Sequence, residues 1–426
     1  MKMMVKRLLL IKNGTLVDAF GTTKADILIE DNDIIEVKKG IREKADERID
    51  ASGKIIVPGF VNMHSHLPMS LLRNNAEGKT LGKWLKEDIF PAERRMDEKD
   101  MYLGSYLGIA ESLSGGITTT NSVYLEKSHL GGKAADELNA RVFLGCDELE
   151  EDGEEELKSA LKFNERIRGY RMARPVMASH SVYSCKRENL ILKKGYAKQK
   201  SLKYHIHMSE TRKEVFHSIR NFRMRPVEYA ESMGLLDENT ILAHAGWVTK
   251  REIGIIARKK SVVVNNPVSN LKLATGGIMP LEQYREAGAR IALGTDGPAS
   301  NNSISMLETM KVSSLLQKHR YWNASLGNPK EILGYATYGG AKALGLKAGK
   351  LEKGYLADLV IIDPKINMVP LGDIYASLVF SCNNSNIGTV IVDGKISFEN
   401  GKVRNFDGKN MKMFLERADA LTSGSS

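Results

Sequence analysis

The chain has 426 residues, of which 42% are hydrophobic and 27% are charged, and its formal net charge is +10. This length can bury a large core and more than one domain, and the composition argues against a disordered or fibrous chain. Lysines and arginines are spread along the sequence without a long basic run, which favours a solvated surface over a nucleic-acid interface. No apolar stretch approaches the roughly 20 residues that a membrane span needs, so we expect no membrane partner.

Cysteine usage and the amino terminus predict a cytoplasmic protein. The three cysteines, Cys146, Cys185 and Cys382, are far apart and odd in number, so no disulfide framework is expected. Such usage fits a reducing compartment. The apolar run at residues 8–11 is too short for a signal peptide, and no cleavage site follows it.

The amino-terminal and carboxyl-terminal segments both show a sequence pattern typical of short strands joined by turns. Near the amino terminus, Lys12-Asn13-Gly14 and residues 30–33 supply turn residues between apolar or alternating runs. An Asp-Gly turn ends the last apolar run near the carboxyl terminus. The predicted strands of these two segments are 7–11, 26–29, 34–37, 358–364 and 388–395.

Between residues 56 and 345, apolar β-branched runs alternate with helical stretches such as 100–113 and 278–287. Eight β/α units in succession predict an α/β fold, a parallel (β/α)₈ TIM-type barrel. Active sites of such barrels lie at the carboxyl ends of the strands. The strand candidates are 55–62, 117–122, 141–144, 175–179, 203–207, 240–244, 262–265 and 290–294.

Polar side chains gather at the predicted carboxyl ends of these strands. His64 and His66, at i and i+2 on the first strand, point to the same side, where two imidazoles can hold one metal ion. Five of the nine histidines fall at strand ends, which is not expected of scattered structural histidines. The strand-end residues are His64, His66, His180, His207, Glu210, His244 and Asp296.

Some of these residues form a plausible metal site. Three imidazoles and one carboxylate suit a single divalent ion, with Zn²⁺ favoured and Fe²⁺ second. A bound metal lowers the pKa of its water towards about 7. The candidate ligands are His64, His66, His207 and Asp296.

Three residues are candidates for the catalytic chemistry. Asp296 could accept the proton of the water, in addition to touching the metal. Glu210 lies past the end of its strand and is a natural proton shuttle to the substrate. His244 could orient the attacking oxygen and stabilise charge as it develops.

Each of these residues also has a structural interpretation. A single strand-end histidine is more often a hydrogen-bonded barrel residue than a ligand, and Glu210 could interact with a helix dipole. His205 shares a face with His207 but lies deeper, which favours interior packing. Surface, helical or loop positions are expected for His129, His217 and His319 and for the acidic run from Asp147 to Glu156, which we place on a solvated loop or helix start.

Several motifs resemble a known family. Residues 58–66, Pro-Gly-Phe-Val-Asn-Met-His-Ser-His, resemble the first-strand motif of the amidohydrolase superfamily. Other segments are similar to its 5-methylthioadenosine/S-adenosylhomocysteine deaminase group of cyclic-amine deaminases, whose relatives include chlorotriazine hydrolases and guanine deaminases. These segments are 68–73, 84–85, 91–93, 205–211, 267–273, 294–302 and 349–360.

The resemblance implies a barrel at 58–345 and a small β-sandwich built from residues 1–57 and 346–426. It implies one metal ion on the ligands named above. Substrate contacts would come from Glu93, His180, Glu210 and Asp296. The implied reaction is hydrolytic deamination of adenosine-type nucleosides, namely 5-methylthioadenosine, S-adenosylhomocysteine, 5′-deoxyadenosine or adenosine. Water attacks the amine-bearing ring carbon, Glu210 delivers a proton to the ring nitrogen, and ammonia leaves.

The chain departs from the group at substrate-facing positions. Two arginines that often follow the third strand are replaced by Cys146 and, on a gapped alignment, about Glu155, and an acidic ribose-side residue falls at Gly82. A carboxylate tail thereby loses a bidentate anchor. The seventh strand leads into Asn265-Asn266-Pro267, where the group often has a histidine first. These departures concern the substrate rather than the reaction.

Other functions fit the sequence less well. An aminohydrolase or chlorohydrolase of the same group, acting on a triazine, pterin or purine base, is the main alternative. A non-catalytic barrel is disfavoured because no ligand is lost, and a binuclear site is disfavoured because His180 stands where a bridging lysine would be needed. The cysteine positions exclude the zinc deaminases of nucleic acids. We therefore expect a small-molecule substrate and no nucleic-acid partner. The sequence does not determine the oligomeric state and is compatible with a homo-oligomer.

Overall fold

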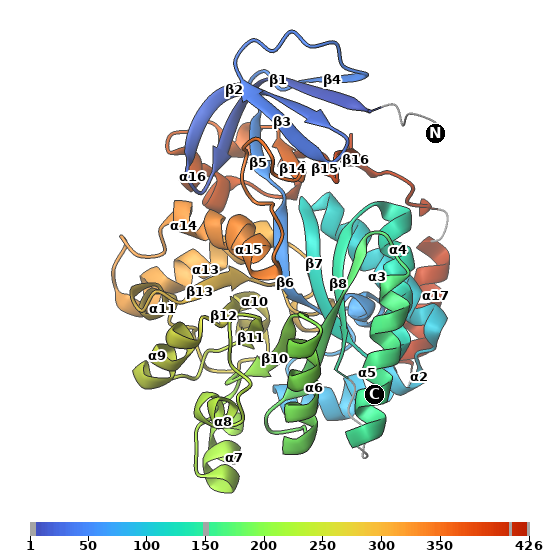
Figure 1. Ribbon diagram of the computed structural model, residues 1–426, viewed down its shortest axis with the longest axis vertical. Helices are drawn as coiled ribbons and strands as arrows, with labels where there is room; N and C mark the ends of the chain where they lie inside the picture. Colours follow the sequence, from blue (N-terminus) through green and yellow to red (C-terminus); the bar gives the residue numbers. More distant parts are fainter. Residues whose placement is uncertain (1–5, 148–152, 409–410, 424–426) are drawn as a thin grey trace.

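The computed structural model describes residues 6–147, 153–408 and 411–423. Its centre is a sheet of eight parallel strands that follow one another in chain order, which confirms the predicted barrel (Figure 1). Every strand is largely buried, as expected where helices cover a parallel sheet. The strands are β6 (Phe60–Ser65), β7 (Ile117–Tyr124), β8 (Arg141–Cys146), β9 (Ala173–Ser181), β10 (Tyr204–Met208), β11 (Thr240–His244), β12 (Val262–Asn265) and β13 (Arg290–Leu293).

Helices connect these strands. Several begin at capping residues, as where Asp97 accepts from Asp100 N at 2.9 Å. The main helices after each strand are α3 (Glu98–Ser114), α4 (Gly131–Leu138), α5 (Gly153–Arg168), α6 (Arg187–Gln199), α7 (Arg212–Phe222), α8 (Pro226–Ser232), α9 (Lys250–Lys259), α10 (Pro267–Lys272), α11 (Leu281–Glu286), α12 (Pro298–Asn301), α13 (Met306–Tyr321), α14 (Pro329–Gly334) and α15 (Gly340–Leu344).

The terminal segments form a second sheet at one end of the barrel (Figure 1). It has nine strands in the order β17-β16-β15-β14-β5-β1-β2-β3, with β4 paired to β1, so the expected sandwich is one continuous sheet built from both termini. Its strands are β1 (Leu8–Asp18), β2 (Gly21–Glu30), β3 (Asp33–Lys38), β4 (Glu47–Asp50), β5 (Ile55–Pro58), β14 (Leu359–Ile362), β15 (Ile387–Val392), β16 (Lys395–Glu399) and β17 (Lys402–Val403).

Two details of the predicted strands were wrong. Lys12-Asn13-Gly14 is not a turn but an irregularity inside β1, where the register with β2 shifts between Ile11 and Gly14. Asn13 there has a φ of 62°, which asparagine tolerates. The predicted strand 55–62 is divided at Gly59: β5 pairs with β14 in the terminal sheet, while β6 opens the barrel. The chain thus passes from one sheet to the other between residues 58 and 60.

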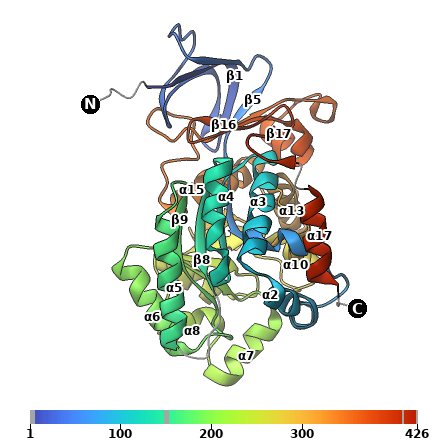
Figure 2. The ribbon, with the colours of Figure 1, turned by 90° about the vertical axis from the view of Figure 1, so that its right-hand side faces the viewer.

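The last helix of the chain, α17 (Met411–Thr422), packs on the barrel (Figure 2). Arg417 donates to both carboxylate oxygens of Asp100 on α3, at 2.7 and 2.6 Å. Arg95, at the end of α2 (Phe90–Arg95), donates to the carbonyl of Leu421 at 3.1 Å.

The domain limits remain those predicted from the sequence, and we propose a barrel domain at 58–345 and a second domain built from 1–57 and 346–426. Among the helices of the described residues, none has the length and apolar composition for crossing a bilayer.

Candidate metal centre and active site

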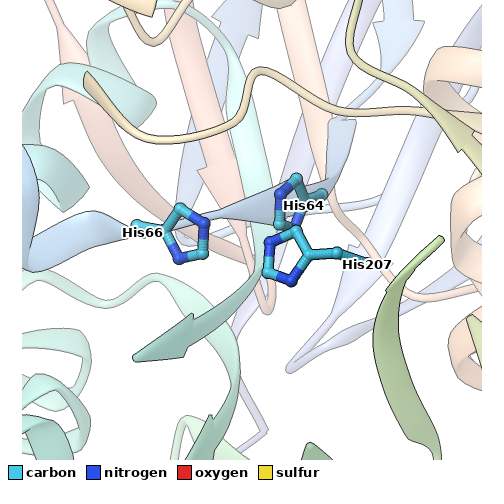
Figure 3. A group of neighbouring side chains, drawn as sticks. All are labelled: His64, His66 and His207. Carbon is cyan, nitrogen blue, oxygen red and sulfur yellow. The ribbon is translucent and has the colours of Figure 1, made fainter. Parts of the chain in front are cut away.

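Three histidine rings meet at the carboxyl ends of β6 and β10. His64 lies on β6, His66 directly follows this strand, and His207 lies on β10 (Figure 3). The ring centroid of His64 lies 4.9 Å from that of His66 and 4.8 Å from that of His207. One ring nitrogen from each lies within 4.8 Å of the other two, a spacing that a single metal ion can bridge.

Asp296 brings a carboxylate to the same place. Its Oδ1 lies 3.4 Å from Nε2 of His64 and 3.4 Å from Nε2 of His66. Ser269 Oγ donates to its Oδ2 at 2.5 Å. Burial acts against ionisation of Asp296, but its interactions with His64 outweigh this and hold the pKa of the carboxyl well below its usual range. A carboxylate is the form that binds metal.

Asp296 reaches this position because the backbone before it approaches β6 closely. Its amide donates to the carbonyl of His64 at 2.9 Å. A Cβ at Gly294 would lie 2.4 Å from Oδ1 of Asn266 and 2.9 Å from the backbone nitrogen of His64, so only glycine fits there. Asp296 itself has a φ of 64°, a left-handed conformation that aspartate tolerates and that is frequent at functional sites.

Hydrogen bonds orient two of the three rings. Nδ1 of His66 donates to the carbonyl of Val123 at 2.6 Å, and Nδ1 of His207 donates to the carbonyl of His180 at 2.8 Å. A carbonyl can only accept, so Nδ1 carries the proton and Nε2 keeps its lone pair. Burial lowers the pKa of His207 to about 4, which keeps the ring neutral and able to bind metal.

The environment of His64 indicates whether the site suits a metal ion. The residue is 0% exposed, and neither ring nitrogen has a hydrogen-bond partner among the described residues. Burial lowers its pKa well below the usual range. A buried imidazole without partners is costly, and a metal ion on Nε2 would satisfy it. The donor set therefore fits a divalent ion.

His244 lies beside the metal cluster. Together with His64 and Asp296 it forms a second group whose ligand atoms lie within 4.8 Å of one another. Its Nδ1 donates to Oδ1 of Asn270 at 2.8 Å, which leaves Nε2 free towards the site. Its Nε2 lies 3.9 Å from Oε1 of Glu210. His244 is thus placed either to touch the ion or to orient what the ion holds.

Glu210 follows β10 and is 8% exposed. Burial and the nearby charge of Asp296 raise the pKa of Glu210 to about 8. The backbone at this point is anchored by Glu214, whose two carboxylate oxygens accept from Ser209 N at 2.7 Å and from Glu210 N at 2.8 Å. The site therefore holds a carboxyl that can be protonated near neutral pH, at a fixed position.

A cavity of about 580 Å³ opens over these residues. It is lined by all predicted site residues except His64, which lies beneath. Glu93, on α2, accepts from the hydroxyl of Tyr124 at 2.6 Å. His180, at the carboxyl end of β9, interacts with Ser184 Oγ at 2.7 Å, and burial lowers its pKa to about 4. Trp84, Phe90 and Leu273 add apolar walls that suit a flat ring.

The remaining histidines do not line the cavity. His205 lies inside the barrel, stacked on His64 with ring centroids 5.0 Å apart, as expected for an interior packing residue. His129 is buried beside Arg166, and His217 lies on α7 and His319 on α13. None of the last three contacts the metal cluster.

The chain differs from the deaminase group that it resembles at several positions, and the side chains at these positions do not line the cavity. Cys146 is buried at the end of β8, Glu155 is exposed on α5 beside Lys158, and Gly82 lies on α1 (Leu81–Trp84) between two lining residues. Three charged residues that the sequence analysis missed do line it: Arg94, Lys127 and Asp147.

The acidic run does lead into a helix start, because Glu156 lies in the first turn of α5, but both of its ends are buried rather than solvated. Asp147 is 8% exposed and faces the cavity, and Glu156 is 2% exposed in an ion pair with Lys193 at 2.6 Å. Residues 148–152 lie outside the described residues. The predicted third strand ended at residue 144, whereas β8 continues to Cys146, and so Asp147 was not recognised as a strand-end residue.

Comparisons with known proteins show the family of the chain. Residues 55–397 match the Amidohydrolase family. The chain is 38% identical to a 5-methylthioadenosine/S-adenosylhomocysteine deaminase of Pyrococcus furiosus, over 92% of this chain and 96% of the relative. It is 36% identical to a 5′-deoxyadenosine deaminase of Methanosphaera stadtmanae, over 93% and 94%. The crystal structure of an adenosine deaminase from Xanthomonas campestris with bound zinc superposes with a TM-score of 0.91 at 27% identity, covering 97% of this chain and 98% of that one.

Proposed function

The chain belongs to the amidohydrolase family, and we propose that it deaminates adenosine-type nucleosides by hydrolysis, converting them to the inosine analogue and ammonia. The proposed substrates are 5-methylthioadenosine, S-adenosylhomocysteine, 5′-deoxyadenosine and adenosine. The observation that carries the proposal is the placement of Glu210, a buried carboxyl of raised pKa, beside the His64–His244–Asp296 cluster and inside an apolar-walled cavity. Relatives of known activity and high coverage support the same reaction.

We assign His64, His66, His207 and Asp296 as the residues that would hold one divalent ion, with Zn²⁺ favoured over Fe²⁺. When bound, such an ion supplies Lewis-acid activation of water at neutral pH. Neither ring nitrogen of His64 makes a hydrogen bond to the described residues, and Nε2 lies 3.4 Å from Oδ1 of Asp296, the other candidate ligand, which supports the role of His64 as a ligand. The hydrogen bonds on Nδ1 of His66 and His207 present the remaining nitrogen of each ring to the site.

Residues of the protein would then transfer the protons of the reaction. With the purine between the apolar walls, Glu210 donates its proton to the ring nitrogen next to the amine-bearing carbon, which makes that carbon electrophilic. Water adds to the carbon and passes one proton to Asp296, which hands it to the departing amino group. His244 hydrogen-bonds the oxygen that has added. As the C–N bond breaks and ammonia leaves, the remaining O–H proton returns to Glu210 and the ring gains a carbonyl.

The test is ammonia release by the purified, metal-loaded protein from adenosine, 5′-deoxyadenosine, 5-methylthioadenosine, S-adenosylhomocysteine and guanine, together with chloride release from a chlorotriazine. We expect turnover of the nucleosides, with equimolar inosine analogue. Because no arginine follows β8 at the expected positions, we expect the compounds without a homocysteine tail to be preferred. Turnover confined to a free base or a triazine would refute the nucleoside assignment. A tenfold or greater preference for S-adenosylhomocysteine would reverse the ranking.

A further inference from the structure

Asp147 is an acidic side chain in the cavity that the proposed reaction does not use. It is the first residue after β8, it is 8% exposed, and it lines the cavity. Its backbone nitrogen donates to the carbonyl of Tyr124 at 3.0 Å, which fixes its position. Within the described part of the chain its carboxylate receives no hydrogen bond and forms no ion pair.

The other carboxylates of the cavity already have partners or roles. Asp296 accepts from Ser269, and Glu93 accepts from the hydroxyl of Tyr124. Glu210 faces His244. The cavity cations, Arg94 and Lys127, are both exposed to solvent, and no ion pair joins either of them to Asp147. The carboxylate of Asp147 therefore faces the cavity without a protein donor among the described residues, which leaves its two oxygens available to a ligand that brings hydrogen-bond donors.

The barrel order indicates which part of a nucleoside would meet Asp147. Glu210 and Asp147 follow β10 and β8, and His180 lies at the carboxyl end of β9, the strand between them. A purine whose reacting edge meets Glu210 extends past His180, and its sugar then lies towards the end of β8. The charge of Asp147 reaches this side of the site, because it acts to raise the pKa of His180 and His207 against the stronger effect of burial.

We propose that Asp147 is a specificity-determining residue that binds the vicinal hydroxyls of the substrate's ribose. A carboxylate has two oxygens that can accept from two adjacent O–H groups, and hydrogen bonds to an ionised acceptor are roughly twice as strong as neutral ones. The protein would therefore select ribonucleosides over their deoxy counterparts. This inference rests on the proposed deamination of nucleosides.

The experiment compares kcat/KM for adenosine, 2′-deoxyadenosine, 3′-deoxyadenosine and 2′,3′-dideoxyadenosine in the metal-loaded wild type and in Asp147→Asn and Asp147→Ala. For the wild type we expect a loss of about 10- to 100-fold from adenosine to the dideoxy compound, the usual effect of a hydrogen bond to a charged group. Both variants should lose a similar factor on adenosine and discriminate less than about threefold between adenosine and the dideoxy compound.

Two matched carboxamide variants serve as controls. Glu155→Gln, on the exposed face of α5, should retain the wild-type discrimination. Glu93→Gln tests the competing acceptor: discrimination that vanishes there and persists in Asp147→Asn would overturn the proposal. Metal content and thermal midpoint establish that each variant is folded. Calorimetric binding of inosine and 2′,3′-dideoxyinosine to the wild type and Asp147→Asn should show the same loss of discrimination without turnover.

The outcomes separate this inference from the function on which it rests. Ammonia release from adenosine with wild-type discrimination intact in both Asp147 variants refutes the role of Asp147 alone. No ammonia release from any nucleoside by the metal-loaded wild type refutes the proposed function, and the inference falls with it.

Discussion

The side chain of Asn62 joins the first and last strands of the barrel to each other through Thr295. Its Nδ2 donates to Oγ1 of Thr295 at 2.7 Å, and its Oδ1 accepts from the backbone nitrogen of Thr295 at 3.0 Å. The contact lies two residues before His64 and one residue before Asp296. A side chain therefore replaces the strand pairing between β6 and β13 at the point where two candidate ligands must meet.

Removing this link should loosen the metal site. We expect Asn62→Ala to lower the free energy of unfolding by about 2–4 kcal/mol, since each buried group left unpaired costs roughly 1–3 kcal/mol. Metal affinity should fall by about 10- to 100-fold, as for other groups that orient ligands. Thermal unfolding and metal titration measure both effects. Asn221→Ala, on the exposed surface of α7, is the control and should change neither.

Metal content tests the ligand assignment directly. We expect the purified protein to carry about one Zn²⁺ or Fe²⁺ per chain, because the ligand set surrounds one position. Chelation should abolish ammonia release and lower the thermal midpoint, and readdition of Zn²⁺ should restore both. Elemental analysis counts the ions. Two ions per chain would contradict the mononuclear assignment.

Glu210→Gln should separate catalysis from metal binding. The glutamine keeps the shape of the side chain but cannot give or take a proton, so we expect kcat to fall by about 10²- to 10⁴-fold. Metal content should be unchanged because Glu210 is a shuttle rather than a ligand. Glu155→Gln is the matched exposed control and should retain full activity. Retained turnover in Glu210→Gln would remove Glu210 from the mechanism.

The raised pKa of Glu210 predicts a pH dependence. Burial and the charge of Asp296 raise this pKa to about 8, so the carboxyl carries its proton below that pH and loses it above. Since the protonated form donates to the ring nitrogen, kcat/KM should fall as the pH rises through about 8. A pH–rate profile from 5 to 10 measures this. The residual activity of Glu210→Gln should lack this limb, and a wild-type profile that is flat across pH 8 would contradict the assignment.

Gly294 should not tolerate a side chain. In Gly294→Ala the new Cβ would overlap Oδ1 of Asn266 and crowd the backbone of His64. We expect a destabilisation of about 1–3 kcal/mol, typical of overpacking, together with reduced metal content. Gly195→Ala is the control: nothing lies within 4 Å of its Cβ position in α6, and the change should stabilise by up to about 1 kcal/mol. Thermal unfolding and elemental analysis check both variants, and a fully metal-loaded Gly294→Ala of normal stability would contradict the prediction.

Much of the fold and part of the candidate site could be predicted without coordinates. The sequence alone led to eight strands, a barrel and a family resemblance, all of which are confirmed. It also led to the strand-end residues, because parallel strands of a barrel place all their carboxyl ends at one rim. A residue lies at that rim when it stands at the carboxyl end of a strand. Correct prediction of the strands was therefore sufficient to select His64, His207 and Asp296.

Only the tertiary structure decided how these side chains face one another. The second cluster joins residues far apart in the chain, namely His64, His244 and Asp296, and so does the link from Asn62 to Thr295. The solvent-exposed position of Glu155 depends on the direction of its side chain. Asp147 shows the physical reason: extending β8 by two residues turned an apparent surface acid into a buried cavity residue. Strand periodicity indicates which face a residue takes, but burial and partners depend on what the rest of the chain brings against that face.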